Sequence, residues 1–221
     1  MLIRTDEQIK QDVVRELTWD YRVNAADISV NVSNGVVTLT GSVPSYTARN
    51  FATSDAWGIA GVKSVNNLLT VTFPTTVTVP TDAEVKSNVE STLTWSASVD
   101  STAIDVSVAN GTVTLEGTVD EYWQRWKAED LVSDLSGVIT VENHLTVVPT
   151  ESYVDKDIAE DIEAALERNL YVDAESVTVK VENGAVTLTG TLPTYNARRR
   201  AYSAAANTLG VVEVNNNIVV A

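Results

Sequence analysis

Apolar residues spaced four apart open three separate stretches of the chain and predict three amphipathic helices. In the first stretch, Ile9, Val13 and Leu17 lie on one side of a helix with 3.6 residues per turn. Thr5 and Gln8 precede this stripe with the spacing of a capping box, which marks the start of the helix. The stripe recurs as Val85, Val89 and Leu93, and again as Ile158, Ile162 and Leu166.

Alternating apolar and polar residues around an Asn-Gly dipeptide follow each helix and predict a β-hairpin. In the first copy, a two-residue loop at Asn34-Gly35 sets Val32 opposite Val37 and Val30 opposite Leu39. These apolar pairs then share one face of the sheet, so the turn and the pattern agree. The dipeptide recurs at Asn110-Gly111 and Asn183-Gly184.

The hairpin register also places Gly41 opposite Ile28, where a glycine indicates close backbone approach or a bulge. A second helix is expected from about Tyr46 to a glycine stop at Gly61, followed by a last strand around Asn67. If the second and third strands are neighbours, this helix is a parallel crossover, although the pattern does not fix the strand order. The same residues recur as Gly117, Tyr122, Gly137 and Asn143, and as Gly190, Tyr195, Gly210 and Asn216.

The copies align without gaps at two constant offsets, which establishes an internal repeat. We therefore expect an α+β protein of three tandem αββαβ modules, each a three-stranded sheet with two helices packed on one face. The modules are assigned to residues 1–74, 80–149 and 152–221. Short linkers that contain proline join them, so a limited range of module orientations is expected.

At this point the residues resemble a known family. The Asn-Gly-x-Val-Thr-Leu-x-Gly hairpin and the closing Gly-Val-x-x-Val-x-Asn are similar to the BON domain (bacterial OsmY and nodulation), three times over. The resemblance implies a role in osmotic or envelope stress, binding to phospholipid or to other proteins, and no catalytic residues. Many family members are exported.

Composition narrows the function further. The 221 residues carry a net charge of -15, which disfavours nucleic acid as a partner. No cysteine is present, which excludes disulfides, zinc thiolate sites and cysteine nucleophiles. The first residues do not form a signal peptide and no stretch is long enough for a transmembrane segment, so a cytoplasmic location is expected, or a periplasmic one if the chain is a processed form.

No motif indicates catalysis, a metal or a cofactor, and the protein is not expected to be an enzyme. The single histidine, His144, is not repeated in the other modules and has the outward parity of its strand, so a surface position is expected. Phosphate-binding glycine motifs are absent from the sequence. A binding protein is therefore the leading interpretation, and a rigid structural adaptor, whose modules pack on one another and bind only proteins, is the alternative.

Two polar positions recur in every module. Asn67 shares the parity of apolar neighbours, so we expect it to face inward and bond to loop backbone. Arg49 follows the repeated tyrosine by one helical turn, and an acidic partner within the module is the favoured reading, with anion recognition as the alternative. The equivalents of this arginine are Arg125 and Arg198.

Charge is distributed unevenly among the modules. Residues 76–149 hold three basic and twelve acidic residues, whereas residues 1–75 hold six and seven. The last module contains the run Arg198, Arg199 and Arg200. Contact with an anionic phospholipid surface should therefore involve the first module or this run, because the second module would be repelled.

Trp19 lies on the side of the first helix opposite its apolar stripe, beside Arg15 and Arg22. The second module repeats the tryptophan as Trp95, and the third replaces it with Arg168. In one explanation, Trp19 and the two arginines contact a lipid or another ligand. In the other, each tryptophan packs on the neighbouring module, and this is favoured because it also explains the charge in the last module.

Overall fold

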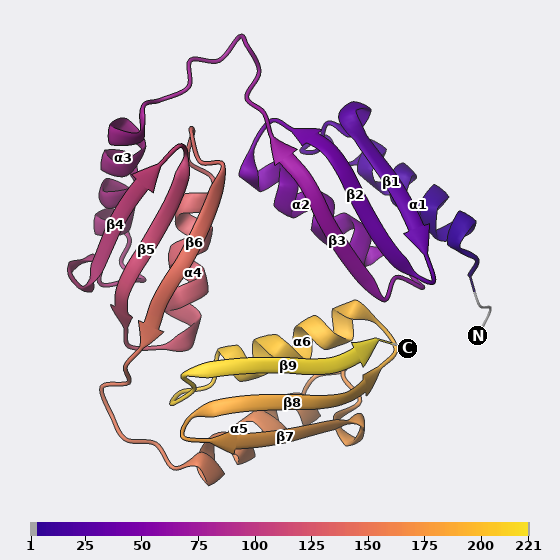
Figure 1. Cartoon of the computed structure of the whole chain (residues 1–221). Helices are drawn as coiled ribbons and strands as arrows, with labels where there is room; N and C mark the ends of the chain where they lie inside the picture. Colours follow the sequence, from indigo (N-terminus) through magenta and orange to yellow (C-terminus); the bar gives the residue numbers. More distant parts are fainter. Residues whose placement is uncertain (1–3, 221) are drawn as a thin grey trace.

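The computed structural model describes residues 4–220 and contains three successive αββαβ modules (Figure 1). The first consists of α1 (Asp6–Trp19), β1 (Ile28–Ser33), β2 (Val36–Val43), α2 (Tyr46–Gly58) and β3 (Ser64–Val71). The second consists of α3 (Asp82–Trp95), β4 (Ile104–Ala109), β5 (Thr112–Val119), α4 (Tyr122–Ser133) and β6 (Thr140–Val147). The third consists of α5 (Asp155–Glu167), β7 (Val177–Glu182), β8 (Ala185–Leu192), α6 (Tyr195–Ala206) and β9 (Glu213–Val220).

Each sheet has its strands in sequence order, with an antiparallel hairpin and a parallel third strand. The predicted register is confirmed, since Val32 pairs with Val37 and Val30 with Leu39. The second helix is the parallel crossover from β2 to β3. The α+β fold expected from the sequence is therefore confirmed in all three modules.

Gly41 confirms the expected close approach of two backbone segments. Its φ is +118°, and a Cβ at this position would clash with the carbonyl oxygen of Asp27. Gly117 and Gly190 are in the same situation. Only glycine fits here, because it combines a positive φ with the absence of a side chain.

Each Asn-Gly turn is held by the first residue of the first helix. Asn34 and Gly35 both have positive φ, and their N–H groups donate to the carboxylate of Asp6 at 2.7 and 2.9 Å. A charged acceptor shared by two backbone donors is a strong form of hydrogen bond. Asp82 and Asp155 bind the other two turns in the same way. This clasp was not expected, although an aspartate at the same offset in each repeat was a visible signal.

The core of each module lies between the sheet and its two helices. Ile9, Val13 and Leu17 are all buried, as are Val37 and Leu39 on the facing side of the sheet. The opposite face of the sheet carries mainly serine, threonine and asparagine and is open to solvent. Each module thus has its two helices on one side and a polar sheet surface on the other.

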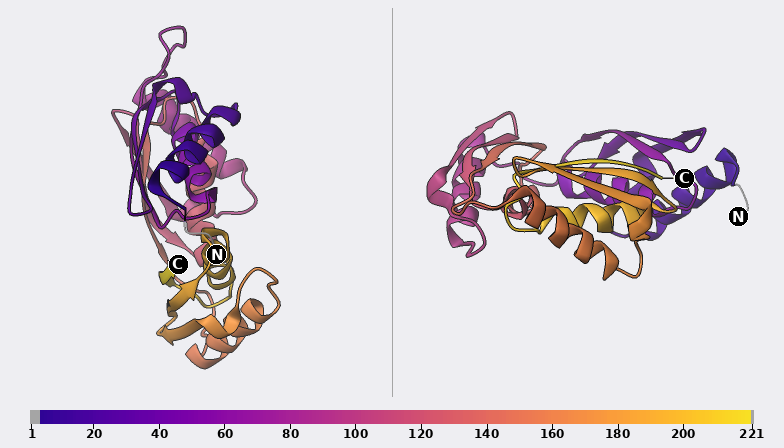
Figure 2. Two further views of the ribbon diagram at one scale, coloured as in Figure 1. Left: turned by 90° about the vertical axis from the view of Figure 1, so that its right-hand side faces the viewer. Right: turned by 90° about the horizontal axis from the view of Figure 1, so that it is seen from below.

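The three modules form a closed triangle (Figure 1). The second helices α2, α4 and α6 face the centre, and the first helices α1, α3 and α5 lie toward the outside. Seen from the edge, the triangle is flat, with the sheets on one broad side and the helices on the other (Figure 2). The arrangement is close to a threefold one, in which each module meets both others.

The modules meet at three junctions. At the first two, the contact is made by the repeated tyrosine at the start of the second helix. Tyr46 is buried within the hydrophobic cluster of the second module, and its hydroxyl lies 3.5 Å from a carboxylate oxygen of Glu129. Burial, and then the charge of Glu129, raise the pKa of Tyr46. Tyr122 is likewise buried in the cluster of the third module and meets Tyr202 edge-on, with 3.1 Å between their hydroxyls.

The third junction closes the triangle between modules that no linker joins. Here Tyr195 stacks on Trp57 of the first module, with ring centroids 4.2 Å apart and planes 11° from parallel. Trp57 lies one helical turn beyond Thr53, which is the repeat equivalent of the residues that meet Tyr46 and Tyr122. The closing contact is therefore shifted by a turn relative to the other two.

Candidate binding surfaces

The last residue of the first helix, or the loop after it, exposes large apolar side chains to water in each module. In the first module Trp19 is 82% exposed and Tyr21 is 95% exposed, and in the second Trp95 is 89% exposed. In the third, Leu170 is 98% exposed and Tyr171 is also exposed. Trp19 and Trp95 are repeat equivalents, as are Tyr21 and Leu170. We call the end of each first helix, together with the loop after it, the first-helix tip of that module.

The favoured explanation for Trp19, packing on the neighbouring module, is wrong. Its high exposure leaves most of the indole in contact with solvent, and Trp95 is exposed to the same extent. Modules do pack on one another, but the repeated tyrosines make those contacts. The charge at Arg168 therefore needs another explanation than capping of the repeat.

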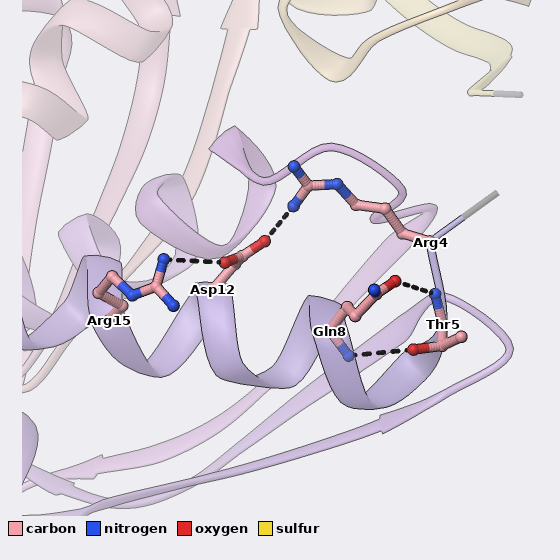
Figure 3. Close-up of polar contacts among 5 residues, drawn as sticks. All are labelled: Arg4, Thr5, Gln8, Asp12 and Arg15. Carbon is pink, nitrogen blue, oxygen red and sulfur yellow. Dashed lines mark hydrogen bonds and ion pairs between the residues drawn. The ribbon is translucent and has the colours of Figure 1, made fainter. Parts of the chain in front are cut away.

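Both arginines expected beside Trp19 are paired with acidic groups. Arg15 lies 3.3 Å from Asp12, which also binds Arg4, so the carboxylate is shared by two arginines (Figure 3). Arg22 binds Asp20 at 2.6 Å, and this contact lowers the pKa of the Asp20 carboxyl to about 2. Arg15 remains largely exposed, whereas Arg22 is the more constrained of the two.

Arg22 also covers an aromatic ring, and the third module repeats this contact with the roles exchanged. The Arg22 guanidinium lies 3.8 Å from the ring centre of Phe51 on α2. At the equivalent positions of the third module, Arg200 on α6 lies 5.4 Å from the ring of Tyr171. In such cation–π contacts the guanidinium is attracted to the electron-rich face of the ring. In both modules the pair fastens the first-helix tip to the second helix.

The run of three arginines on α6 does not form one basic face. Arg198 points to β9 and donates to the carbonyl of Asn216 at 3.1 Å. Arg200 faces the opposite way, toward Tyr171, while Arg199 lines a cleft toward the first module. Consecutive residues on a helix are about 100° apart, so three in a row must diverge. Whether any of them binds a ligand stays a prediction.

Arg198 belongs to a clasp that every module repeats. Asn216 donates from its amide to the carbonyl of Arg198, and its own amide oxygen accepts from the backbone N–H of Ile218. The same reciprocal bonds join Arg49 with Asn67 and Arg125 with Asn143. The asparagines are therefore inward-facing, but they bind the second helix rather than a loop. The arginines bind backbone carbonyls rather than the acidic groups that the sequence suggested.

Among residues 4–220, no group of three or more metal-ligating side chains is placed to hold an ion. His144 is exposed, as its parity predicted, and it lies 4.0 Å from Glu142. Within the same range, none of the helices is both long and apolar enough to cross a membrane. The exposed tips and the clefts between modules are thus the candidate binding surfaces.

Two helices on one face of a mixed three-stranded sheet, repeated three times, define a tandem α+β repeat protein. The profile of the BON domain matches residues 5–72, 81–149 and 154–221. The chain belongs to the BON domain family, and its three matches coincide with the three modules of the structure.

The chain is similar to the Osmotically-inducible protein Y of Escherichia coli (strain K12). The two are 32% identical over 143 residues, which cover 63% of this chain and 71% of the relative. Among solved structures, the C-terminal domain of CdsD, a structural protein of the type III secretion system of Chlamydia trachomatis, matches across 96% of both chains. Its TM-score is 0.27 at 15% identity.

Proposed function

We propose that this protein is a non-enzymatic binding protein of the osmotic stress response that docks on phospholipid headgroups through its first-helix tips. The osmotic context rests on the named relative, which is osmotically inducible. The binding role rests on one observation. Every module exposes at least one large apolar side chain at its first-helix tip.

The energetic cost of exposing these apolar side chains to water favours a role in binding a membrane surface over no binding role. Leaving apolar area in water costs about 25 cal/mol per Å², so a repeated exposure of this kind marks an interaction site. Tryptophan and tyrosine suit the boundary between headgroups and acyl chains, because each has an apolar body and a polar tip. The tip of the first module adds Trp19 and Tyr21 to the least acidic part of the chain.

The alternative is a rigid adaptor whose modules pack on one another and bind only proteins. The buried junction residues Tyr46 and Tyr122 support the rigid part of this proposal. They do not account for the exposed tips. The first proposal is preferred because it uses both features, with the junctions fixing how the tips are presented.

Co-sedimentation with vesicles tests the proposal. Trp19→Ala combined with Tyr21→Ala should lower the fraction bound to vesicles of phosphatidylcholine and phosphatidylglycerol several-fold. The control is Leu68→Ala, which removes an exposed apolar side chain of similar hydrophobicity from the outer face of β3. This control should bind as the unmodified protein does. Equal binding by the double variant, or no binding by the unmodified protein, would contradict docking through the tips.

Salt and charge variants separate the aromatic from the ionic contribution. If anionic headgroups are recognised, added salt should weaken binding, because charges at a surface are screened within about 10 Å at 0.1 M salt. Arg15→Gln, which affects an exposed arginine next to the first tip, should weaken binding less than loss of the two aromatic residues. Replacing Arg198, Arg199 and Arg200 by glutamine tests the arginine run in the same assay.

A further inference from the structure

The junction that closes the triangle contains a cleft of about 530 Å³. One wall is the end of α2 with Trp57, and the other is the start of α6 with Thr194, Tyr195 and Arg199. Tyr171 from the tip of the third module completes the lining. A volume of this size lies within the range of small-molecule sites in proteins, which is roughly 300–1,000 Å³.

The cleft is cationic, although the chain as a whole is strongly acidic. None of the residues that line it is aspartate or glutamate. Arg199 is exposed, and within residues 4–220 it takes part in no ion pair. A second cavity of about 340 Å³, also without a carboxylate, shares Trp57, Tyr195 and Arg199 and reaches Arg198, whose buried Nε has no hydrogen-bond partner.

The other two junctions differ in this respect. Glu129 lies at the junction of the first and second modules, where Asp134 also binds Thr47 at 2.5 Å. Glu129 lines the cavity between the second and third modules as well. The repeat equivalents of Arg199 are Asn50 and Trp126, so the charge of Arg199 is specific to the closing junction, whereas Arg125 lines the other cavity together with Glu129. The charge of Arg199 is therefore not a feature that all three modules share.

The start of α6 adds partial positive charge to the same wall. Thr194 caps the helix by accepting from the N–H of Ala197. The N–H groups of Tyr195 and Asn196, in the first turn, have no acceptor within the helix. Such groups and the helix dipole favour an anion. Trp57 from the other wall stacks on Tyr195, so the cleft combines aromatic surface with positive charge.

We propose that this cleft binds a small organic anion that carries an aromatic ring. Its phosphate or carboxylate contacts Arg199 and the first turn of α6, and its ring lies against Trp57 and Tyr171. The site is formed by the first and last modules together, so it exists only in the closed triangle. It shares Tyr171 with the first-helix tip of the third module, but it does not involve Trp19 and Tyr21 of the first module.

Titration with three probes, followed by NMR of the tryptophan indole N–H signals, tests the proposal. Phenyl phosphate carries both groups, inorganic phosphate only the anion, and benzyl alcohol only the ring. We expect phenyl phosphate to shift the Trp57 signal saturably and more tightly than either of the other two. No saturable shift, or equal binding of benzyl alcohol or inorganic phosphate, would overturn it.

Arg199→Gln should weaken the affinity for phenyl phosphate at least about tenfold, because it removes a charge-assisted hydrogen bond. Lys86→Gln, which removes one exposed positive charge from the second module, is the matched control and should have no effect. Unchanged affinity in Arg199→Gln, with its thermal unfolding also unchanged, rules out the site. The variant lacking Trp19 and Tyr21 should bind phenyl phosphate normally, which keeps this test independent of lipid docking.

Discussion

The junctions between linked modules and the junction that closes the triangle use the same repeated tyrosine in different ways. Tyr46 and Tyr122 are buried in the core of the following module, whereas Tyr195 is only half-buried and stacks on Trp57. The linked modules are held near each other by the chain, so their contact costs little entropy. The closing contact also joins neighbours within one chain, but across a longer and looser connection.

From this difference we expect the buried tyrosines to contribute most to stability and the stacked pair to border a binding site. The buried Tyr122 borders a smaller cavity of about 320 Å³, which Glu129 also lines. The stacked pair leaves a cleft beside it, where Arg199 meets no carboxylate. Two junctions thus have a buried tyrosine, and the closing junction has a half-buried stacked pair beside an open cleft.

The largest effect is expected at a linked junction. Tyr122→Ala should lower the free energy of unfolding by about 3 kcal/mol, because it removes a buried aromatic ring from the core of the third module. Urea unfolding monitored by tryptophan fluorescence measures this change. The control is Tyr21→Ala, where the ring is already in water and the change should stay within about 0.5 kcal/mol. Similar losses in the two variants would show that the junction does not carry stability.

A smaller effect is expected at the closing junction. Trp57→Ala removes the stack on Tyr195, a contact of about 1 kcal/mol beyond its buried area. The first and third modules should then separate, and the radius of gyration from X-ray scattering should rise while helix content stays constant. Trp95→Ala is the matched control, since it deletes the same side chain from an exposed tip. A Trp57→Ala protein as compact as the control would mean that other contacts close the triangle.

The interior of a module was predictable because its signals are local. Asn34-Gly35 fixes both the turn and the register, so the pairs of Val30 and Val32 followed from the sequence. The strand order required long-range information, because hydrophobic alternation does not say which strands are neighbours. The clasp between Arg49 and Asn67 was missed because both bonds use backbone carbonyls, which leave no trace in residue types.

The junctions were harder to predict, for a physical reason. The repeat revealed Tyr46, Tyr122 and Tyr195, but a tyrosine at the start of a helix is compatible with many environments. Their partners differ in each case and show no periodicity in the sequence. Trp19 was misread because its position on the helix excluded the core of its own module, which left two alternatives that only burial distinguishes.

The smallest effect is expected from Asp55, two residues before Trp57. It lies on α2, which takes part in both a linked junction and the closing junction. Burial, and then the charges of Asp20 and Glu16, raise the pKa of Asp55 from 3.8 to about 6. Because the folded pKa is raised, the stabilising contribution is fully present below the unfolded value of 3.8 and is lost as pH rises through about 6.

Asp55→Asn removes the charge and should raise Tm by about 2 °C at about pH 8, and this gain should shrink as the pH is lowered to about 4. Asp105→Asn, on the outer face of β4, makes the same chemical change at an exposed position and should show no such pH-dependent gain. A gain that is independent of pH, or one that Asp105→Asn reproduces, would show that the ionisation of Asp55 does not oppose folding.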